Sequence, residues 1–258
     1  MTGVQTFALP ISFFVHREKV CLVQVTLGET DYLVDPLAPG VDLKRLGPVF
    51  ADPERTKIFH DSEYDVLILQ REYGLRFKGL FDTRVAAATL GSSAPGLASV
   101  LQDHFDVELD KSQQRSNWGL RPLSPEQVAY ARLDTRFLIP LMHRQRKALQ
   151  SAGRLMILES ECLRLEAMRV SPIVFNPDEW VRVKGARGLQ PRERAALREL
   201  FILREELAAK VNAPLFRVMN NAALLALAQG LPTTSRQLTS IRGFSSRMER
   251  RMGRQVLD

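Results

Sequence analysis

The front of the chain alternates between short runs typical of buried strands and longer segments with helical periodicity. Segments 19–27 and 31–37 are rich in β-branched residues and flank a turn, so we expect two adjacent strands. Segment 57–74 begins as a short strand and continues as an amphipathic helix, with Ser62 as its N-cap. A further strand and an Ala-rich helix are expected over 75–91. This alternation predicts a mixed α/β fold.

A polar stretch separates two helices further along. A short helix is expected over 96–105, and the polar residues 106–126, with two prolines, predict a long functional loop. A Ser-Pro-Glu helix entry then opens a long helix over 124–150, in which we expect a kink at Pro140.

The last third of the sequence is helical. Pro and Gly mark a linker over 171–187. The amphipathic helices that follow are expected over 191–212, 221–230 and 235–241. The predicted architecture is therefore an α/β domain over 12–170 and a small all-α domain over 188–258.

Composition narrows the class of protein. Hydrophobic residues at 45% and charged residues at 25% are globular values, which excludes disordered and fibrous classes. Cys21 and Cys162 lie far apart and form no CxxC pattern, so neither a disulfide framework nor a zinc site is indicated. No apolar run approaches the ~20 residues that span a bilayer. We expect a cytoplasmic protein with no membrane partner.

The net charge of +7 is unevenly distributed. Residues 176–258 hold 15 Lys and Arg against 8 Asp and Glu, whereas the preceding 175 residues balance at 21 of each. A basic excess arises either from an ordinary solvated surface or from a surface that follows a polyanion.

Four residues, a tyrosine and three aspartates, are candidates for chemistry. Tyr130 and Asp134, four residues apart, share one helix face and bring a phenol beside a carboxylate, although a core Tyr with an Asp at its rim gives the same pattern. Asp65 falls early in a helix, where an acid is also stable for electrostatic reasons. For Asp82 we favour a helix cap.

The order of three segments identifies a family. HDSEYDVLIL, FDTRVAAATLG and LDKSQQRSNWGLRPLSPEQVAYARLD together resemble the ribonuclease D family of 3′–5′ exonucleases, over roughly residues 13–165. The resemblance implies a ribonuclease H-like fold, with a mixed sheet flanked by helices. It assigns Asp65 to the family's second motif, and Tyr130 and Asp134 to the Y-x-x-x-D third motif.

The same resemblance implies a two-metal site. Phosphodiester hydrolysis needs a hydroxide and a stabilised leaving oxygen, which two divalent ions about 4 Å apart can supply. Four carboxylates suit Mg²⁺ or Mn²⁺, so two such cations are the expected cofactors. Tyr130 would orient the attacking water through its hydroxyl.

The family's first motif, D-x-E, is missing. Laying the usual DTESNSFF pattern on Ser12 places Phe7 at the Asp and Leu9 at the Glu, and neither side chain can bind a metal. One interpretation is natural loss of activity. Another is replacement by a different carboxylate, but Glu18 lies in another register.

A third interpretation concerns residues 1–11 as a whole. They differ from MTGVQTCALPI, the translation of a common sequencing adaptor, only at Phe7. This predicts a read-through artefact that replaced the true first strand. With half of the carboxylates absent, we expect the chain as written to have little or no activity.

Two sets of residues are candidates for substrate binding. In the polar loop, cations beside one aromatic residue suit phosphates and a stacked base. These are Lys111, Gln114, Arg115, Trp118 and Arg121, although a Trp118 anchored in the core would also fit.

His60 is interpreted as a structural histidine at the end of a strand.

Residues 189–243 resemble the helicase and ribonuclease D C-terminal (HRDC) domain, a helical bundle that commonly assists nucleic-acid binding. Behind its core lie Arg242, Arg247 and Arg250, which could contact phosphate if they gather on one face, or could be solvated.

The expected function is a metal-dependent 3′–5′ exoribonuclease that trims RNA such as transfer-RNA precursors, crippled in this chain. The expected partner is RNA with a free 3′ end, bound by a monomer. The alternatives are a non-catalytic nucleic-acid-binding protein and a DNA-directed exonuclease, because nothing in the sequence reports contact with a 2′-hydroxyl.

Overall fold

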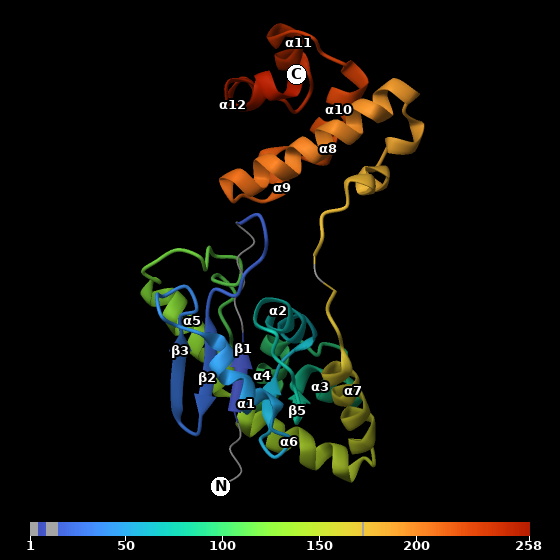
Figure 1. Cartoon of the computed structure of the whole chain (residues 1–258). Helices are drawn as coiled ribbons and strands as arrows, with labels where there is room; N and C mark the ends of the chain where they lie inside the picture. The colour runs from blue at the N-terminus through green and yellow to red at the C-terminus, as the bar shows by residue number, and fades with distance from the viewer. Residues whose placement is uncertain (1–4, 9–14, 172) are drawn as a thin grey trace. The chain divides into compact units, whose positions relative to one another are not determined.

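The computed structural model describes residues 5–8, 15–171 and 173–258 (Figure 1). Contacts divide these residues into two units. The first contains residues 5–8 and 19–171, and the second contains residues 15–18 and 173–258. Each unit has its own hydrophobic core.

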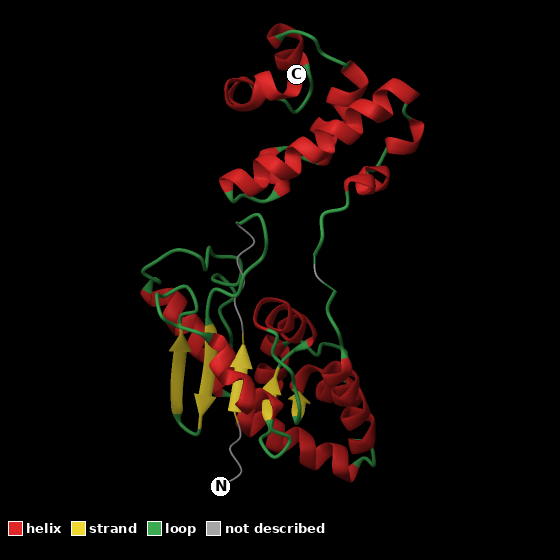
Figure 2. Cartoon of the chain, in the orientation of Figure 1, coloured by secondary structure: helices red, strands yellow, loops and turns green. Residues whose placement is uncertain are grey.

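The first unit is built on a mixed five-stranded sheet, shown in yellow in Figure 2, which confirms the predicted class. Its strand order is β3-β2-β1-β4-β5. β1 pairs antiparallel with β2 and parallel with β4, and β4 pairs parallel with β5. The bounds are Gln5–Ala8 for β1, Val23–Leu27 for β2, Thr30–Val34 for β3, Lys57–Phe59 for β4 and Leu80–Asp82 for β5.

Helices cover both faces of this sheet. In chain order they are α1 (Gly47–Ala51), which follows the short 3₁₀ turn Leu43–Leu46, then α2 (Glu63–Tyr73), α3 (Thr83–Thr89), α4 (Leu97–Phe105), α5 (Pro125–Arg136), α6 (Leu138–Ser151) and α7 (Leu155–Ala167). The predicted strands and helices of this unit all form. One detail differs, because the long helix ends at Arg136 and a second begins at Leu138, so Pro140 lies in the first turn of α6 rather than at a kink.

The two faces of β1 meet different partners. Thr6 on β1 accepts a hydrogen bond from the Thr26 amide at 3.2 Å, and the Thr26 hydroxyl lies 2.8 Å from the hydroxyl of Thr135 on α5. Side chains alternate along a strand, so Phe7 faces the opposite side. There it packs on Phe50 of α1, with ring centroids 4.6 Å apart. α5 and α1 therefore cover opposite faces of the sheet.

The second unit is helical throughout its described part. Two 3₁₀ turns, Pro177–Arg182 and Ala186–Gly188, precede α8 (Pro191–Val211), α9 (Leu215–Val218), α10 (Asn221–Gly230), α11 (Ser235–Ser240) and α12 (Ser246–Leu257). The three helices predicted here form close to their expected bounds. Among the described residues of the whole chain, no helix is long and apolar enough to cross a membrane.

Candidate active site

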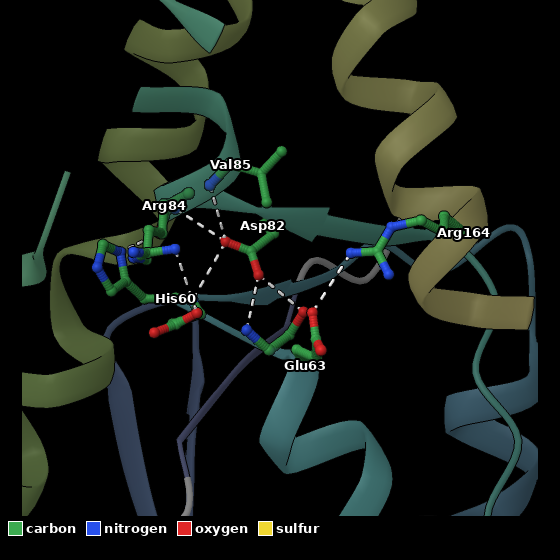
Figure 3. Close-up of polar contacts among 9 residues, drawn as sticks. His60, Glu63, Asp82, Arg84, Val85 and Arg164 are labelled. Carbon is green, nitrogen blue, oxygen red and sulfur yellow. Dashed lines mark hydrogen bonds and ion pairs between the residues drawn. The ribbon is translucent and has the colours of Figure 1, made fainter. Parts of the chain in front are cut away.

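Asp82, the last residue of β5, ties two helix starts together (Figure 3). Its buried carboxylate caps α3 by accepting from the amides of Arg84 at 2.9 Å and Val85 at 3.1 Å. It also accepts from the Asp61 amide at 3.2 Å and from the amide and hydroxyl of Ser62, both at 2.7 Å. The predicted cap is confirmed, and its five hydrogen bonds make Asp82 a structural acid.

The cap predicted for α2 is wrong in one respect. Ser62 does precede the helix, but its side chain makes no capping hydrogen bond to α2. Its hydroxyl donates to Asp82 instead. The backbone of Ser62 is itself helical, with φ −69° and ψ −12°, rather than extended as in a typical N-cap, so its hydroxyl is not placed to accept from the amides of α2.

Asp65 lies in the first turn of α2, in an electrostatic setting opposite to that of Asp82. It is half-buried, and its pKa is raised well above the ordinary value. The main cause is burial, followed by the negative charges of Asp82, Asp61 and Asp134. Asp65 and Asp134 are therefore close enough to repel each other.

Tyr130 and Asp134 form the second part of this site. Their side chains are hydrogen-bonded on one face of α5. Burial raises the pKa of Asp134 to about 7, and the Tyr130 hydroxyl acts in the opposite direction. The pKa of Tyr130 is also raised, first by burial and then by the Asp134 charge. Three residues expected at the site are thus brought near one another.

A capping box fixes the start of α5. The Ser124 hydroxyl accepts from the Gln127 amide at 3.2 Å, and the Gln127 side chain accepts from the Ser124 amide at 3.0 Å. Gln127 also donates to the Ser116 hydroxyl at 2.9 Å, which ties the polar loop to the helix. The loop is therefore fixed to the start of the helix that carries Tyr130 and Asp134.

The donor set for two divalent cations is incomplete. Among the described residues, no group of three or more His, Cys, Asp or Glu side chains is placed to hold a metal ion. Asp65 and Asp134 supply two carboxylates, and the charge of Asp134 is among the causes that raise the pKa of Asp65. The residues present do not fit a four-carboxylate site, so no step of hydrolysis is assigned to a metal on this chain.

The first strand, β1, has the sequence QTFA and so contributes no carboxylate. Phe7 is 1% exposed and lies between Phe50 and Phe59, on the face of the sheet away from α5. It offers an apolar ring where the family pattern expects an Asp. Leu9, the other first-motif position, lies outside the described residues.

In the polar loop, the expectation for Trp118 is wrong. Its ring is 2% exposed, packs near Tyr130 at a centroid distance of 5.9 Å, and donates from Nε1 to the Gln113 carbonyl at 3.2 Å. A ring buried in this way cannot stack on a base. Trp118 instead anchors the loop to α5.

The expectation for Arg121 also needs correction. Its guanidinium holds both carboxylate oxygens of Asp35 at 2.6 Å and donates to the carbonyls of Cys21 and Trp118. These contacts commit Arg121 to fastening the loop to the sheet. Lys111, Gln114 and Arg115 are exposed and remain candidates for phosphate contacts.

His60 directly follows β4 and contacts α3. Its Nδ1 lies 2.9 Å from the Thr83 hydroxyl, and burial lowers its pKa. Its Nε2 is buried and finds no hydrogen-bond partner among the described residues.

In the second unit, exposed arginines follow α12. Arg247, Arg250 and Arg254 recur at spacings of three and four residues, so they share one helix face. Arg250 and Arg254 also line an open cavity of about 790 Å³, together with Lys210 of α8. Arg242 is exposed in the turn before α12.

Sequence reasoning passed over Gln24 on β2, which the structure places beneath α5. Its signal was a polar residue inside the alternating apolar run 19–27. The side chain is fully buried.

Comparison with known proteins agrees with this geometry. Residues 10–150 match the 3′-5′ exonuclease family, and residues 193–258 match the HRDC domain. A ribonuclease D from Gluconacetobacter diazotrophicus is 34% identical over 231 residues, which cover 88% of this chain and 58% of the relative. The chain thus spans less than two thirds of that relative's length.

Solved structures give the same result. The catalytic core of RRP6 from Trypanosoma brucei superposes with a TM-score of 0.87 at 28% identity, covering 98% of this chain and 72% of the other. Brucella melitensis NrnC with bound Mg²⁺ shares the fold, with a TM-score of 0.57 at 24% identity over 63% of this chain and 81% of that one. The chain therefore belongs to the 3′–5′ exonuclease family of phosphodiester hydrolases, has ribonuclease D and RRP6 proteins among its relatives, and carries an HRDC domain behind the exonuclease domain.

Proposed function

We propose that this chain is a 3′–5′ exoribonuclease of the ribonuclease D type that binds RNA at a free 3′ end, with hydrolysis crippled by its first strand. The observation that carries this proposal is the contrast between two elements. α5 brings Tyr130 and Asp134 together close to Asp65, whereas β1 presents Phe7 to an aromatic cluster.

RNA such as a transfer-RNA precursor is the proposed substrate. The ribonuclease D relative supports RNA by its name. Lys111 and Arg115 are exposed in the loop that leads into α5, where a backbone phosphate could be held. In the HRDC unit, the arginine face of α12 and its cavity support a second phosphate contact.

Two divalent cations, Mg²⁺ or Mn²⁺, are the proposed cofactors of a chain whose first strand carries D-x-E. Asp65 and Asp134 would supply half of the carboxylate ligands, and hard oxygen donors select these ions. Tyr130 would hold the attacking water through its hydroxyl. We also propose a monomeric cytoplasmic protein, for which the two free, buried cysteines are consistent with a reducing compartment.

Three chains test the proposal. They are the chain as written, a restored chain with Phe7→Asp and Leu9→Glu, and the restored chain with Asp134→Ala. Each is incubated with Mn²⁺ and a 5′-labelled RNA hairpin that has a single-stranded 3′ overhang. We expect trimming by the restored chain alone. Trimming by the chain as written, abolished by Asp134→Ala, would overturn the proposed crippling.

A matched DNA hairpin separates the substrate classes. Preference for RNA over DNA supports the proposal, whereas equal or faster trimming of DNA would replace it with a DNA-directed exonuclease. A non-catalytic binding role is favoured specifically by the buried Phe7. It would be supported if every chain binds the RNA hairpin and the restored chain trims neither substrate.

A further inference from the structure

The first unit carries a basic segment that its balanced overall charge conceals. Residues 135–158 hold five Lys and Arg and no Asp or Glu, and α6 lies within this segment. The inward face of α6 is mostly apolar and packs in the core. Its outward face carries His143, Arg144 and Lys147, which are exposed, and the exposed Arg154 follows just after the helix. α6 therefore presents a positively charged surface to solvent.

Two of these arginines are held in place by the ends of neighbouring helices. The Arg144 guanidinium lies over the Phe105 ring, 4.2 Å from its centroid, and donates to the His104 carbonyl near the end of α4. Arg154 donates to the Thr89 carbonyl at the end of α3, at 3.0 Å. A guanidinium has five N–H donors, so each arginine keeps several for a ligand. Because they are already fixed, they lose less entropy on binding an anion than mobile side chains do.

No carboxylate neutralises these cations. In the part of the chain that the structure describes, Arg144, Lys147 and Arg154 form no ion pair. The adjoining helix differs, because Arg132 on α5 pairs with Asp31 at 3.2 Å. The charge of α6 is therefore available to an external anion.

This surface fits a nucleic-acid backbone better than a lipid bilayer or a protein partner. A helix that lies in a bilayer inserts its apolar face, whereas the apolar face of α6 is buried in the core. The centre of a protein interface is depleted of charged residues, whereas α6 exposes cations and no large apolar side chain. A nucleic acid carries a negative charge at every nucleotide, so a row of cations suffices to bind it.

We propose that α6 and the cations beside it form an additional contact surface for RNA, which binds the phosphate backbone of a stem while the 3′ end of the same molecule lies at Tyr130 and Asp134. The choice of RNA rests on the proposed function. α6 begins two residues after α5 ends (Figure 1). At 1.5 Å per residue, Arg144 lies within about 15 Å of Asp134. An RNA whose end lies at α5 can therefore reach this surface with its neighbouring nucleotides.

The test measures binding, which needs neither hydrolysis nor a metal. The chain as written is titrated in EDTA, over a salt series, into a fluorescent RNA hairpin with a 3′ overhang and into the overhang strand alone. The α6 variant combines Arg144→Gln, Lys147→Gln and Arg154→Gln.

A matched control variant removes the same charge from three exposed positions outside the segment 135–158. It combines Lys44→Gln, Arg45→Gln and Arg76→Gln. Thermal unfolding of each variant shows whether it is folded. Lys147→Gln alone covers the case in which the α6 variant does not fold, because the Lys147 side chain makes no hydrogen bond or ion pair within the described ranges.

We expect the α6 variant to bind the hairpin about tenfold more weakly, with a log–log salt slope lower by about 2, because each lost phosphate contact retains about one counterion on the RNA. Lys147→Gln alone should weaken binding about threefold and lower the slope by about 1. The control variant should stay within about twofold of its parent, and both triple variants should bind the isolated overhang within about twofold.

Equal losses in the α6 variant and the control would overturn the proposal, because net charge alone would then explain binding. Unchanged hairpin affinity would do the same. An equal loss on the isolated overhang would place these cations on the single strand instead of the stem. If the α6 variant lost binding only to vesicles of phosphatidylserine and phosphatidylcholine, a lipid surface would replace RNA as the partner.

The outcome is separable from that of the proposed function. Hairpin binding that depends on α6, in a restored chain that trims no RNA, would leave this inference standing and remove the proposed exonuclease activity. Trimming by the restored chain, with hairpin affinity unaffected by the α6 substitutions, would do the reverse.

Discussion

Asp82 ends β5 and Asp65 lies in the helix after β4, the neighbouring parallel strand, yet their surroundings are opposite. Asp82 is surrounded by donors from two helix starts and a hydroxyl, so its charge is compensated within the fold. The pKa of Asp65 is raised, first by burial and then by the charges of neighbouring acids. A carboxylate satisfied by the protein is part of the scaffold, whereas one left among like charges is suited to an external cation.

The substitution Asp82→Ala is expected to have the largest effect on stability. It should destabilise the chain by about 3 to 5 kcal/mol, because it removes a helix cap and leaves several buried donors unpaired. Urea denaturation of both chains measures the difference. Asp82→Asn should retain part of the stability, since its oxygen still accepts. A loss below about 1 kcal/mol for the Ala variant would contradict the structural role.

Lys57 extends the comparison to a buried cation. Its ammonium donates to the carbonyls of Asp52 at 2.6 Å and Arg55 at 2.7 Å, and burial lowers its pKa to about 8. Lys57→Met should destabilise by about 1 to 3 kcal/mol at pH 7, because two carbonyls lose their donor.

The pH dependence of Lys57 gives a second readout. Between pH 8 and the ordinary lysine pKa of 10.5, the unfolded chain binds more protons than the folded chain, so the contribution of this group to stability rises with pH. Lys57→Met should lack that rise. The free energy of unfolding of both chains is measured by denaturation at pH 8, 9 and 10. An equal rise with pH in both chains would show that the ammonium is not desolvated as described.

For Asp134 the sign is reversed. Its folded pKa is about 7 against an ordinary 3.8, so the folded chain holds more protons between these values and stability falls as pH rises through this window. In metal-free buffer at pH 8, Asp134→Asn should be more stable than its parent by about 1 kcal/mol, a value reduced for partial exposure. At pH 4 the two should agree. Equal denaturation midpoints at both pH values would remove the contrast with Asp82.

The smallest effect on stability is expected on α12. Changing Arg247, Arg250 and Arg254 together to Ser should alter the free energy of unfolding by less than about 0.5 kcal/mol, because all three are exposed. The salt dependence of binding to single-stranded RNA should nevertheless weaken, with a log–log slope lower by about 2. Fluorescence anisotropy over a salt series measures it. An unchanged slope would show that these arginines do not contact the phosphates of the RNA.

Most of the fold could be predicted because the pattern of β-branched runs, helical periodicity and turn residues agrees with the tertiary packing. The bounds of α2, α8 and α10 follow from that agreement. The break between α5 and α6 could not be placed, because Pro140 permits either a kink or a helix start.

At the site, residue spacing was informative only where a motif is local. Tyr130 and Asp134 lie on one helix, so four-residue spacing suffices. Trp118 and Arg121 are read from sequence as a stacking ring and a phosphate ligand, but long-range contacts to Tyr130 and Asp35 give them structural roles. Gln24 was missed for the same reason, since its burial depends on what lies across the sheet.

The position of β1 makes it an exchangeable part of the sheet. Main-chain ladders hold it to β2 on one side and to β4 on the other, and these ladders do not depend on the identity of the side chains. Architecture and chemistry are therefore inherited separately here. A strand without carboxylates can complete the sheet, so a likeness of shape alone does not report whether the carboxylates of a catalytic site are present.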